Sequence, residues 1–192
     1  MLKITKKKPD FFDDLVKDKK NWDNLRGEEK KIIAEYLKKN EQKGMCAYCE
    51  SKLKENSYHI EHFRKRSLFP ELTFDYNNLF LSCNNENSCG KHKDRYGLTK
   101  DEFNTIYSPL NINFDEFEYT YIGEILGKTP KVKKTIEVFN LNERSLVEKR
   151  KKIIKSIEFC REYLNLDLFE IFQEFKTFLI FLKNSNFFET QN

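Results

Sequence analysis

Several features that define large classes of proteins are missing from this sequence. No apolar run approaches the roughly 18 residues that a membrane-spanning helix needs. The first residues, Met1 to Lys8, are rich in lysine and lack the apolar stretch of a secretory signal. These absences predict a protein that neither spans a membrane nor is secreted, and the expected location is the bacterial cytoplasm.

Cysteine is scarce, and its count of five is odd. A disulfide framework suits neither an odd count nor a chain without an export signal. Cys46, Cys49, Cys83 and Cys89 fall close together, whereas Cys160 stands alone among apolar residues at helical spacing. We therefore expect a four-cysteine group and one cysteine in the core.

The sequence also lacks a strong excess of charge of one sign: it has 35 basic and 31 acidic residues, and the formal net charge is only +4. The excess lies entirely within residues 1–44, and the rest of the chain is neutral overall. A solvated, lysine-rich helix face explains this bias as well as a polyanion partner does.

The 192 residues hold 39% hydrophobic residues, including 18 Phe and 9 Tyr, which is enough for a folded core. We predict an α+β protein that is mainly helical, in three sections. Residues 1–44 form a basic helical arm, residues 45–105 carry the cysteines and histidines, and residues 106–192 form a small hairpin followed by helices.

The first section contains a short helix over 10–16 and a second helix over 28–43. Ile32, Ile33, Tyr36 and Leu37 form the apolar stripe of the second helix, and Gly44 ends it. The first stretch is polar enough to be an interaction arm rather than core.

In the third section, the alternating pattern of residues 117–127 predicts a hairpin around Gly123. Pro130 opens a helix, and Asn142 can cap the next one. A last helix over 167–183 is apolar nearly all round, so it is buried in the chain's own core or against a partner.

The first chemical motif is Cys46-Ala47-Tyr48-Cys49, which places two thiolates at one corner of a tetrahedral metal site. Cys83 and Cys89 would close the site, although their C-x5-C spacing is longer than the usual C-x2-C. A structural zinc ion is the predicted occupant, and buried or redox cysteines without a metal are the alternative.

The second motif, His59-Ile60-Glu61-His62, lies between the two cysteine pairs. A carboxylate is a hard ligand for an ion such as Mg²⁺, and a neutral imidazole can take a proton from water. In a straight strand His59 and Glu61 share one face and His62 lies on the other. Convergence of Glu61 with His62 needs a bend; otherwise His59 and Glu61 form the metal pair.

Two further strings complete the pattern. Asn77-Asn78-Leu79 leads through an apolar stretch to Cys83, and Cys89-Gly90-Lys91-His92-Lys93 begins a helix whose N-terminus favours anions.

The order C-x-x-C, Glu-His, Asn-Leu, Cys, then Cys-Gly-x-His-Lys resembles the HNH endonucleases, whose ββα-metal (His-Me finger) module is often stapled by a four-cysteine zinc site. The string 69–79 and the downstream segments 117–125 and 135–150 resemble the PtuB-like HNH proteins of Septu and retron-associated antiphage systems. The resemblance covers about residues 1–155.

The resemblance implies a role for each matching residue. His62 matches the general base, and Glu61 matches the acidic metal ligand, with Glu in place of the commoner Asp. Asn78 would hold the loop and orient His62. His92 would supply the helix-borne ligand to Mg²⁺ or Mn²⁺, because Gly90 stands where many HNH proteins have Asn or His.

The implied activity is metal-dependent hydrolysis of phosphodiester bonds, most readily in DNA. Six basic residues near the motifs are candidates for phosphate contacts: Arg64, Lys65, Arg66, Lys91, Lys93 and Arg95. The implied partners are a PtuA-like ABC-type ATPase, a retron reverse transcriptase with its msDNA, and a second copy of the chain. A tRNA or other RNA nuclease and a non-catalytic, zinc-stapled nucleic-acid-binding module are the alternatives.

Overall fold

A computed structural model describes residues 1, 3–159 and 167–185 of the protein. The fold is α+β and mainly helical, as predicted. The helices are α1 (Phe11–Val16), α2 (Gly27–Tyr36), α3 (Cys89–Tyr96), α4 (Pro130–Val138), α5 (Arg144–Phe159), α6 (Leu168–Ile171) and α7 (Lys176–Asn184). The strands are β1 (Tyr58–His62), β2 (Leu79–Cys83), β3 (Phe117–Tyr119) and β4 (Ile125–Gly127).

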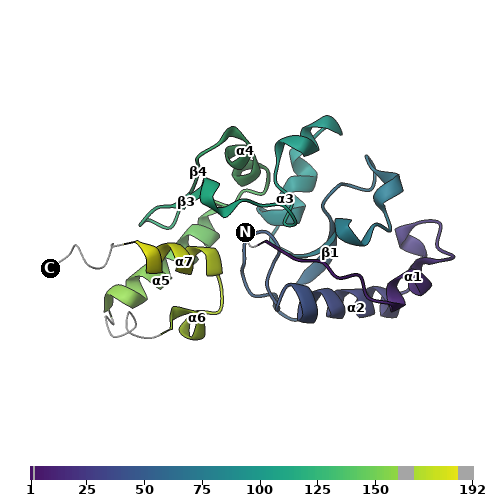
Figure 1. Ribbon diagram of the computed structural model, residues 1–192, viewed down its shortest axis with the longest axis horizontal. Coiled ribbons are helices and arrows are strands. Elements are labelled where there is room, and N and C mark those ends of the chain that lie inside the picture. The colour runs from purple at the N-terminus through teal and green to yellow at the C-terminus, as the bar shows by residue number, and fades with distance from the viewer. Residues whose placement is uncertain (2, 160–166, 186–192) are drawn as a thin grey trace.

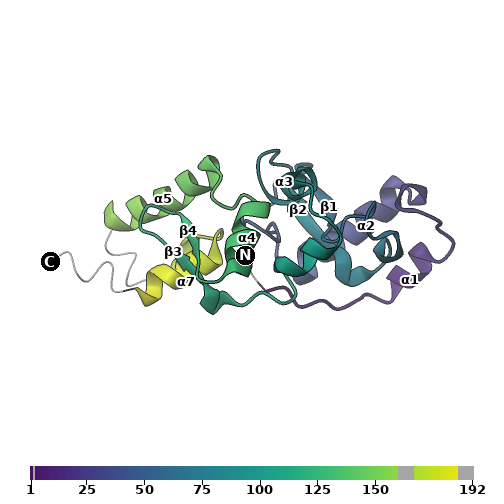
Figure 2. The same cartoon turned by 90° about the horizontal axis from the view of Figure 1, so that it is seen from above.

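The elements follow one another along the long axis of the molecule. α1 and α2 lie at one end, α5 to α7 lie at the other, and β1, β2 and α3 lie between them (Figures 1 and 2). One cluster of buried apolar side chains includes residues from all of these parts. The middle section with the cysteine and histidine motifs is therefore packed on both sides by helices.

The N-terminal section contributes to this core, contrary to the expectation of an interaction arm. Phe12 is 1% exposed and Trp22 is 6% exposed, and both belong to the central apolar cluster. In α2, Ile33 and the following Leu37 are buried, but Ile32 is 47% exposed and lies off the predicted stripe.

β1 and β2 form an antiparallel pair in which Glu61 lies opposite Phe80 and His62 lies opposite Leu79. β2 is the buried strand, since Leu79, Phe80 and Leu81 are each 0% exposed. Within the described residues β1 pairs with β2 alone, and His59, Ile60, Glu61 and His62 of β1 line a cavity. The strand that carries His59, Glu61 and His62 is thus held by an apolar strand behind it.

The predicted hairpin is present as β3 and β4, and Gly123 in its turn has a φ of +80°. A Cβ atom at Gly123 would lie 2.8 Å from the carbonyl oxygen of Val147, so glycine lets the turn rest on α5. Asn142 does not cap α5 as predicted. Its amide instead bonds both the N–H and the carbonyl of Ile125 in β4.

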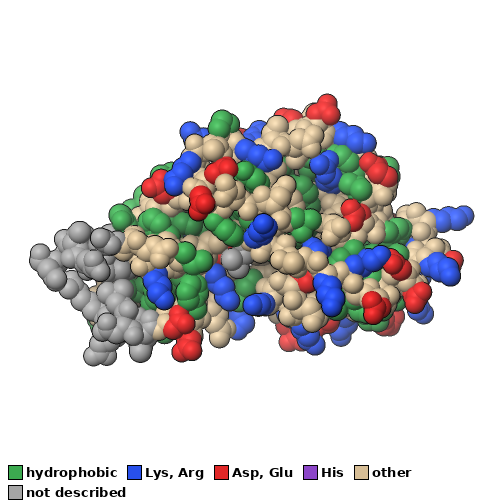
Figure 3. Space-filling view, in the orientation of Figure 1, with side chains coloured by type: hydrophobic (Ala, Val, Ile, Leu, Met, Phe, Trp, Pro, Cys, Tyr) green, Lys and Arg blue, Asp and Glu red, His purple; other side chains and the backbone are tan. Residues whose placement is uncertain are grey.

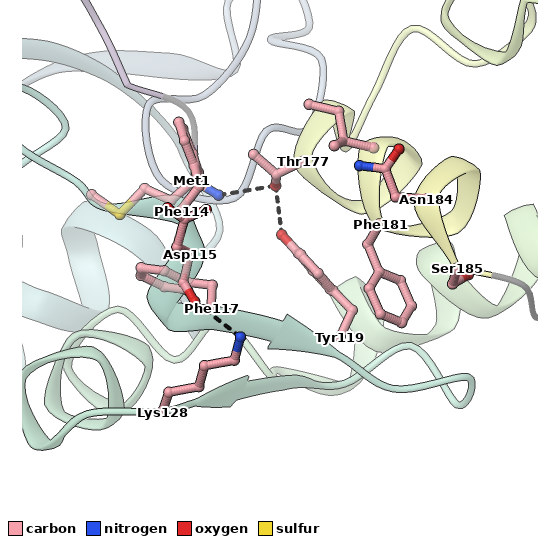
Figure 4. A pocket seen from close by; sticks show the side chains of 11 residues that line it. Met1, Phe114, Asp115, Phe117, Tyr119, Lys128, Thr177, Phe181, Asn184 and Ser185 are labelled. Carbon is pink, nitrogen blue, oxygen red and sulfur yellow. Dashed lines mark hydrogen bonds between the residues drawn. The ribbon is translucent and has the colours of Figure 1, made fainter.

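The predicted last helix is divided into α6 and α7 by a break at 172–175, where Phe175 has a φ of +56°. The carboxylate of Glu50 accepts a hydrogen bond from the backbone N–H of Thr177 at 2.9 Å and so caps α7. Figure 4 shows that the Thr177 hydroxyl hydrogen-bonds the Tyr119 hydroxyl, and that it also accepts a hydrogen bond from the amino group of Met1. Phe178, Leu179 and Leu182 are buried in the chain's own core.

The prediction that Cys160 lies in the core falls on a residue outside the described ranges.

Basic and acidic side chains are interspersed on the face shown in Figure 3 rather than gathered into one patch. Within the described residues, no helix is both long and apolar enough to cross a membrane.

Candidate functional site

The four cysteines of the predicted group converge. The Sγ atoms of Cys46, Cys49, Cys83 and Cys89 all lie within 4.8 Å of one another, and those of Cys49 and Cys83 are 3.9 Å apart. In a tetrahedral Zn²⁺ site with Zn–S bonds of about 2.3 Å, the sulfurs are about 3.8 Å apart. No other group of three or more His, Cys, Asp or Glu residues in the described part of the chain meets the same distance limit.

A short turn presents the first two cysteines. The N–H of Cys46 donates to the carbonyl of Ser51, and the N–H of Glu50 donates to the carbonyl of Cys46. Tyr48, between the two cysteines, is fully buried and stacks on Phe139 with ring centroids 4.2 Å apart. The turn is therefore fixed by its own backbone and by the aromatic core.

The longer second spacing has a structural reason. Cys83 ends β2 and Cys89 begins α3 with a φ of +60°, so the five residues between them make the turn from strand to helix. The Asn140 amide donates to the carbonyl of Asn87 at 2.7 Å and holds this turn against the end of α4. The C-x5-C spacing is thus compatible with a closed four-sulfur site, and the cluster is compatible with zinc.

A second centre lies beside β1. It is a cavity of about 620 Å³ lined by residues from the N-terminal section, β1, the loop after β1, and α3. The titratable or cationic side chains among them are Lys20, His59, Glu61, His62, Lys65, Arg66 and Asp94.

Glu61 is the buried carboxylate of this cavity, with an exposure of 3%. Burial opposes its charge, but the ammonium of Lys93 and a hydrogen bond from His59 outweigh that effect and lower the pKa of Glu61 below its ordinary value. A Cβ atom on Gly90 would lie 2.6 Å from Glu61 Oε2. The glycine that departs from the common HNH pattern is therefore what lets this longer acidic side chain rest against α3.

His59 shares a face of β1 with Glu61, as alternation requires. Its Nε2 lies 3.3 Å from Glu61 Oε2, and its Nδ1 lies 2.8 Å from the side-chain oxygen of Asn84. Burial opposes protonation of His59, but the hydrogen bonds to Glu61 and Asn84 prevail and raise its pKa. β1 stays regular through His62, so the pairing of His59 with Glu61 that a straight strand implies is the one observed.

His62 also lines the cavity, and its hydrogen bond shows which of its two ring nitrogens carries the proton. Nε2–H donates to the carbonyl of Thr73 at 3.0 Å, because a carbonyl can only accept. Nδ1 is then the unprotonated nitrogen. The Trp22 ring packs edge-to-face on the imidazole at 4.6 Å, and burial lowers the pKa of His62 to about 4. His62 is thus a neutral imidazole with a proton-accepting nitrogen at pH 7.

Asn78 binds the loop that follows His62. Its side-chain oxygen accepts from the N–H of Arg64 at 2.7 Å, and its amide donates to the carbonyls of Arg64 and Leu72. These contacts tie the start of the loop to the segment that carries Thr73. The role of Asn78 in catalysis stays a prediction.

His92 lies elsewhere than the resemblance implied. Its Nδ1–H donates to the carbonyl of Val138 at 2.9 Å, and its ring is not among those that line the cavity. Gly90 and Lys93, three residues apart on α3, face Glu61, whereas His92 falls on a different side of the helix.

The six candidate phosphate contacts are in different environments. Lys65 and Arg66 line the cavity, whereas Lys91 and Arg95 pair with Glu86 in the turn between Cys83 and Cys89. Arg64 bonds the side chain of Asn104. Lys93 was expected to touch nucleic acid, but its side chain is 0% exposed and is ion-paired with Glu61.

Among the residues that line the cavity, Trp22 and Asp94 belong to none of the sequence motifs, and Thr73 was noted only as part of the string 69–79. Trp22 and Thr73 reach His62 from 40 residues before it and 11 residues after it, so no local spacing could reveal them. Asp94 follows Lys93 in α3 and was not among the residues singled out from the sequence.

Together, the two centres define a class: a protein with a four-cysteine cluster that could hold a metal ion and, on an adjoining strand–strand–helix unit, a polar cavity lined by a carboxylate and two histidines. No family model matches the chain. Several relatives are similar to it, and three of them are described below. The Septu protein PtuB of Bacillus mycoides is 34% identical over 60% of this chain and 48% of its own length. The HNH endonuclease named for retron Vc95 of Vibrio cholerae is 26% identical, over 82% of this chain and 78% of its own.

The HNH endonuclease named for retron Ec83 of Escherichia coli is 29% identical, over 76% of this chain and 74% of its own. These matches confirm the resemblance of the chain to PtuB-like HNH endonucleases. It spans about half the length of the Septu relative.

Proposed function

We propose that this chain is a metal-dependent HNH endonuclease that hydrolyses phosphodiester bonds of nucleic acid, with DNA as the substrate. The observation that carries the proposal is the state of His62, a neutral imidazole with a free Nδ1 in the same cavity as the charged Glu61. A proton acceptor beside a hard anionic ligand is the minimum for metal-assisted attack of water on phosphorus.

We further propose that β1, β2 and α3 form a ββα-metal module and that the four cysteines hold a structural Zn²⁺. The strand–strand–helix order and the direct packing of α3 on Glu61 through Gly90 support the module. The sulfur distances support the zinc site, which would have no open position for chemistry. The division of the chain into 1–44, 45–105 and 106–192 is part of the same proposal.

Mg²⁺ or Mn²⁺ would be the catalytic ion, and Glu61 would hold it. The donor set fits, because Glu61 is ionised, borders the cavity and presents hard oxygen atoms. His59 hydrogen-bonds Glu61 and would orient the carboxylate or act as a second ligand. The bound ion would supply electrostatic stabilisation to the phosphate as charge develops.

The chain's own residues would do the rest. His62 Nδ1 would accept the proton of the attacking water, while Thr73 fixes the tautomer and Trp22 fixes the plane of the ring. Asn78 would keep the Thr73 loop in place. Lys65 and Arg66, at the border of the cavity, would contact the flanking phosphates, so affinity would fall with salt.

The names of the relatives support a place in antiphage defence. We propose that the chain is the effector subunit of a cytoplasmic complex with a PtuA-like ABC-type ATPase, and that in a retron setting the reverse transcriptase and its msDNA take part. A second copy of the chain is a further proposed partner.

A cleavage assay tests the proposal. The purified chain, alone and with a PtuA-like ATPase, is incubated with duplex DNA, single-stranded DNA and tRNA, with and without Mg²⁺ or Mn²⁺. We expect DNA cleavage that needs the added ion and is lost in Glu61→Gln. Cleavage of tRNA alone would show an RNA nuclease, and binding without cleavage under every condition would show a non-catalytic module.

A further inference from the structure

We propose that a second cavity, bordered by the loop that follows β1, binds one unpaired nucleotide of the nucleic acid. Arg64 and Lys131 would contact its phosphate, and the side-chain amides of Asn104 and Asn111 would contact its base. This inference rests on the proposed nuclease function and adds a requirement on its substrate, a base that lies in a single strand or has left the duplex.

The cavity has a volume of about 400 Å³, within the range of small-ligand sites. Its walls are the loop after β1, the segment 103–111 and the start of α4. His62 lines the β1 cavity, whereas Phe63 and Arg64, the next two residues, line this one. Since neighbouring Cα atoms are about 3.8 Å apart, the two cavities adjoin across the loop. A nucleotide bound here would therefore be close to a phosphate at His62.

Arg64 is held in place by the protein itself. Its backbone N–H donates to the side-chain oxygen of Asn78 at 2.7 Å, and its carbonyl accepts from the same amide at 3.0 Å. Its guanidinium carbon lies 4.9 Å from the centroid of the Phe69 ring, and one of its N–H groups donates to Asn104 at 3.1 Å. A guanidinium has several N–H donors in a fixed plane, and the described residues accept from this one alone. The remaining donors suit the oxygen atoms of a phosphate.

The charges of the cavity favour an anion. The Lys131 ammonium lies 4.7 Å from the centroid of the Tyr107 ring and forms no ion pair within the described residues. Asp75 is the acidic side chain of the lining, and its carboxylate already accepts from the backbone N–H of Asn77 at 2.9 Å. Because Arg64 and Lys131 outnumber this carboxylate, the cavity carries excess positive charge, as phosphate binding requires.

Two side-chain amides line the cavity with their N–H donors unused. The oxygen of Asn104 accepts from Arg64, and the oxygen of Asn111 accepts from the backbone N–H of Ser108 at 3.1 Å. These bonds fix which way each amide is turned, and neither NH₂ group donates to another residue in the described part of the chain. The edges of nucleobases carry ring nitrogens and carbonyl oxygens that accept from such groups.

The same cavity offers apolar surface to the flat face of a base. Its lining includes the buried Phe63 and Phe103 and three aliphatic side chains, Leu72, Ile106 and Leu110. An inorganic anion gains nothing from such surface, whereas an unstacked base is stabilised when its face is covered. A base within a duplex keeps its face stacked and its edge paired, so the ligand is a nucleotide outside a duplex.

The test is the binding of dGMP to the full-length, zinc-loaded chain, because guanine presents hydrogen-bond acceptors along one edge. No Mg²⁺ or Mn²⁺ is added, so binding is measured without cleavage. Nuclear magnetic resonance follows the side-chain amide signals of Asn104 and Asn111, which are assigned from Asn104→Ala and Asn111→Ala. We expect dGMP to shift both signals and to bind at least about tenfold more tightly than inorganic phosphate.

Variants separate the contact to the phosphate from the contact to the base. Arg64→Gln should weaken dGMP binding by at least about tenfold, whereas Lys133→Gln, at an exposed residue of α4 outside the cavity, should match the wild type. Asn111→Ala should weaken dGMP binding by about fivefold or more and leave the affinity for deoxyribose phosphate unchanged. Its control is Asn40→Ala, which removes an exposed amide outside the cavity and should match the wild type.

Unshifted Asn104 and Asn111 signals, equal affinities for dGMP and inorganic phosphate, or wild-type dGMP affinity in Arg64→Gln would each overturn the assignment. If Arg64→Gln does not fold, Lys131→Gln takes its place in the same comparison. Cleavage of DNA by a chain that fails these binding tests would leave the nuclease proposal standing. Binding as expected, with no cleavage of any nucleic acid once Mg²⁺ or Mn²⁺ is added, would leave the nucleotide site standing and refute the nuclease proposal.

Discussion

The four-cysteine cluster and the β1 cavity lie side by side, yet they are built on opposite principles. The cluster draws identical ligands from two segments into one closed set with sulfur atoms within 4.8 Å. The cavity draws unlike groups from the N-terminal section, β1, the following loop and α3, and leaves about 620 Å³ open. The first centre is a close set of four side chains of one type, whereas the second leaves open space between side chains of different types.

This difference separates structural from chemical roles. In the cluster every donor has the same task, so removing one damages the whole. In the cavity Glu61 and His62 project from opposite faces of a regular strand, and each is held by its own partners. Their effects should therefore be separable from each other and from stability.

The largest effect is expected for Cys89→Ser. Zinc binding at such sites carries about 10–16 kcal/mol, which rivals the whole free energy of unfolding of a domain. We expect loss of bound zinc and of cooperative thermal unfolding, measured by elemental analysis and circular dichroism. Ser88→Ala is the control, because the neighbouring hydroxyl is buried without a hydrogen-bond partner in the described part of the chain. A folded, zinc-free Cys89→Ser protein would refute a structural role for the cluster.

His62→Gln should leave the fold intact and reduce cleavage by about 10²–10⁴-fold, the usual contribution of a general base. Glutamine can still donate to the Thr73 carbonyl, but it cannot take a proton from water. Single-turnover rates and DNA affinity are measured together, and affinity should stay unchanged. A rate within tenfold of the wild type would remove His62 from the mechanism.

Gly90→Ala should destabilise the protein by about 1–3 kcal/mol, because the new methyl group would overlap the Glu61 carboxylate in a closely packed place. Chemical denaturation gives the change in unfolding free energy. Gly27→Ala at the start of α2 is the matched control: nothing lies within 4 Å of its added Cβ, so alanine should be neutral or stabilising there. Equal stability of the two variants would argue against the close contact between α3 and β1.

The smallest effect concerns pH. The pKa of His62 falls from 6.5 in the unfolded chain to about 4 in the folded one, so only the unfolded chain is protonated between these values. The folded state accordingly loses stability as pH falls through this window, by roughly 1 kcal/mol at pH 5 after allowance for solvent screening. Unfolding free energies at pH 7 and pH 5 should show a smaller loss in His62→Gln. An identical loss in both proteins would contradict a buried, neutral His62.

Much of the architecture could be predicted because its signals are local. Pro130 marks the start of α4, Gly123 marks the hairpin turn, and the paired cysteines identify the cluster. Each of these depends on the backbone preference or the chemistry of one residue type. The same reasoning failed where a distant segment decides the outcome, as with Asn142, whose amide is taken by β4 instead of capping α5.

The cavity was only partly predictable for the same reason. Glu61, His62 and Asn78 stand out in the sequence, but Trp22 and Thr73 acquire their roles only when separate segments meet around the imidazole. Lys93 looked like a phosphate contact because lysine is usually exposed. Its burial follows from α3 packing on Glu61, which the lack of a side chain at Gly90 permits.

The most direct test asks whether the cysteine cluster serves the fold and the β1 cavity serves catalysis. Cleavage by zinc-loaded protein is measured with the added divalent ion as the only variable. Wild type and Glu61→Gln, each with one zinc per chain and the same melting temperature, are compared with and without Mn²⁺. The account predicts no cleavage by either protein without Mn²⁺, and cleavage only by the wild type when it is present. Full activity of the wild type with zinc alone, or equal activity of Glu61→Gln, would contradict it.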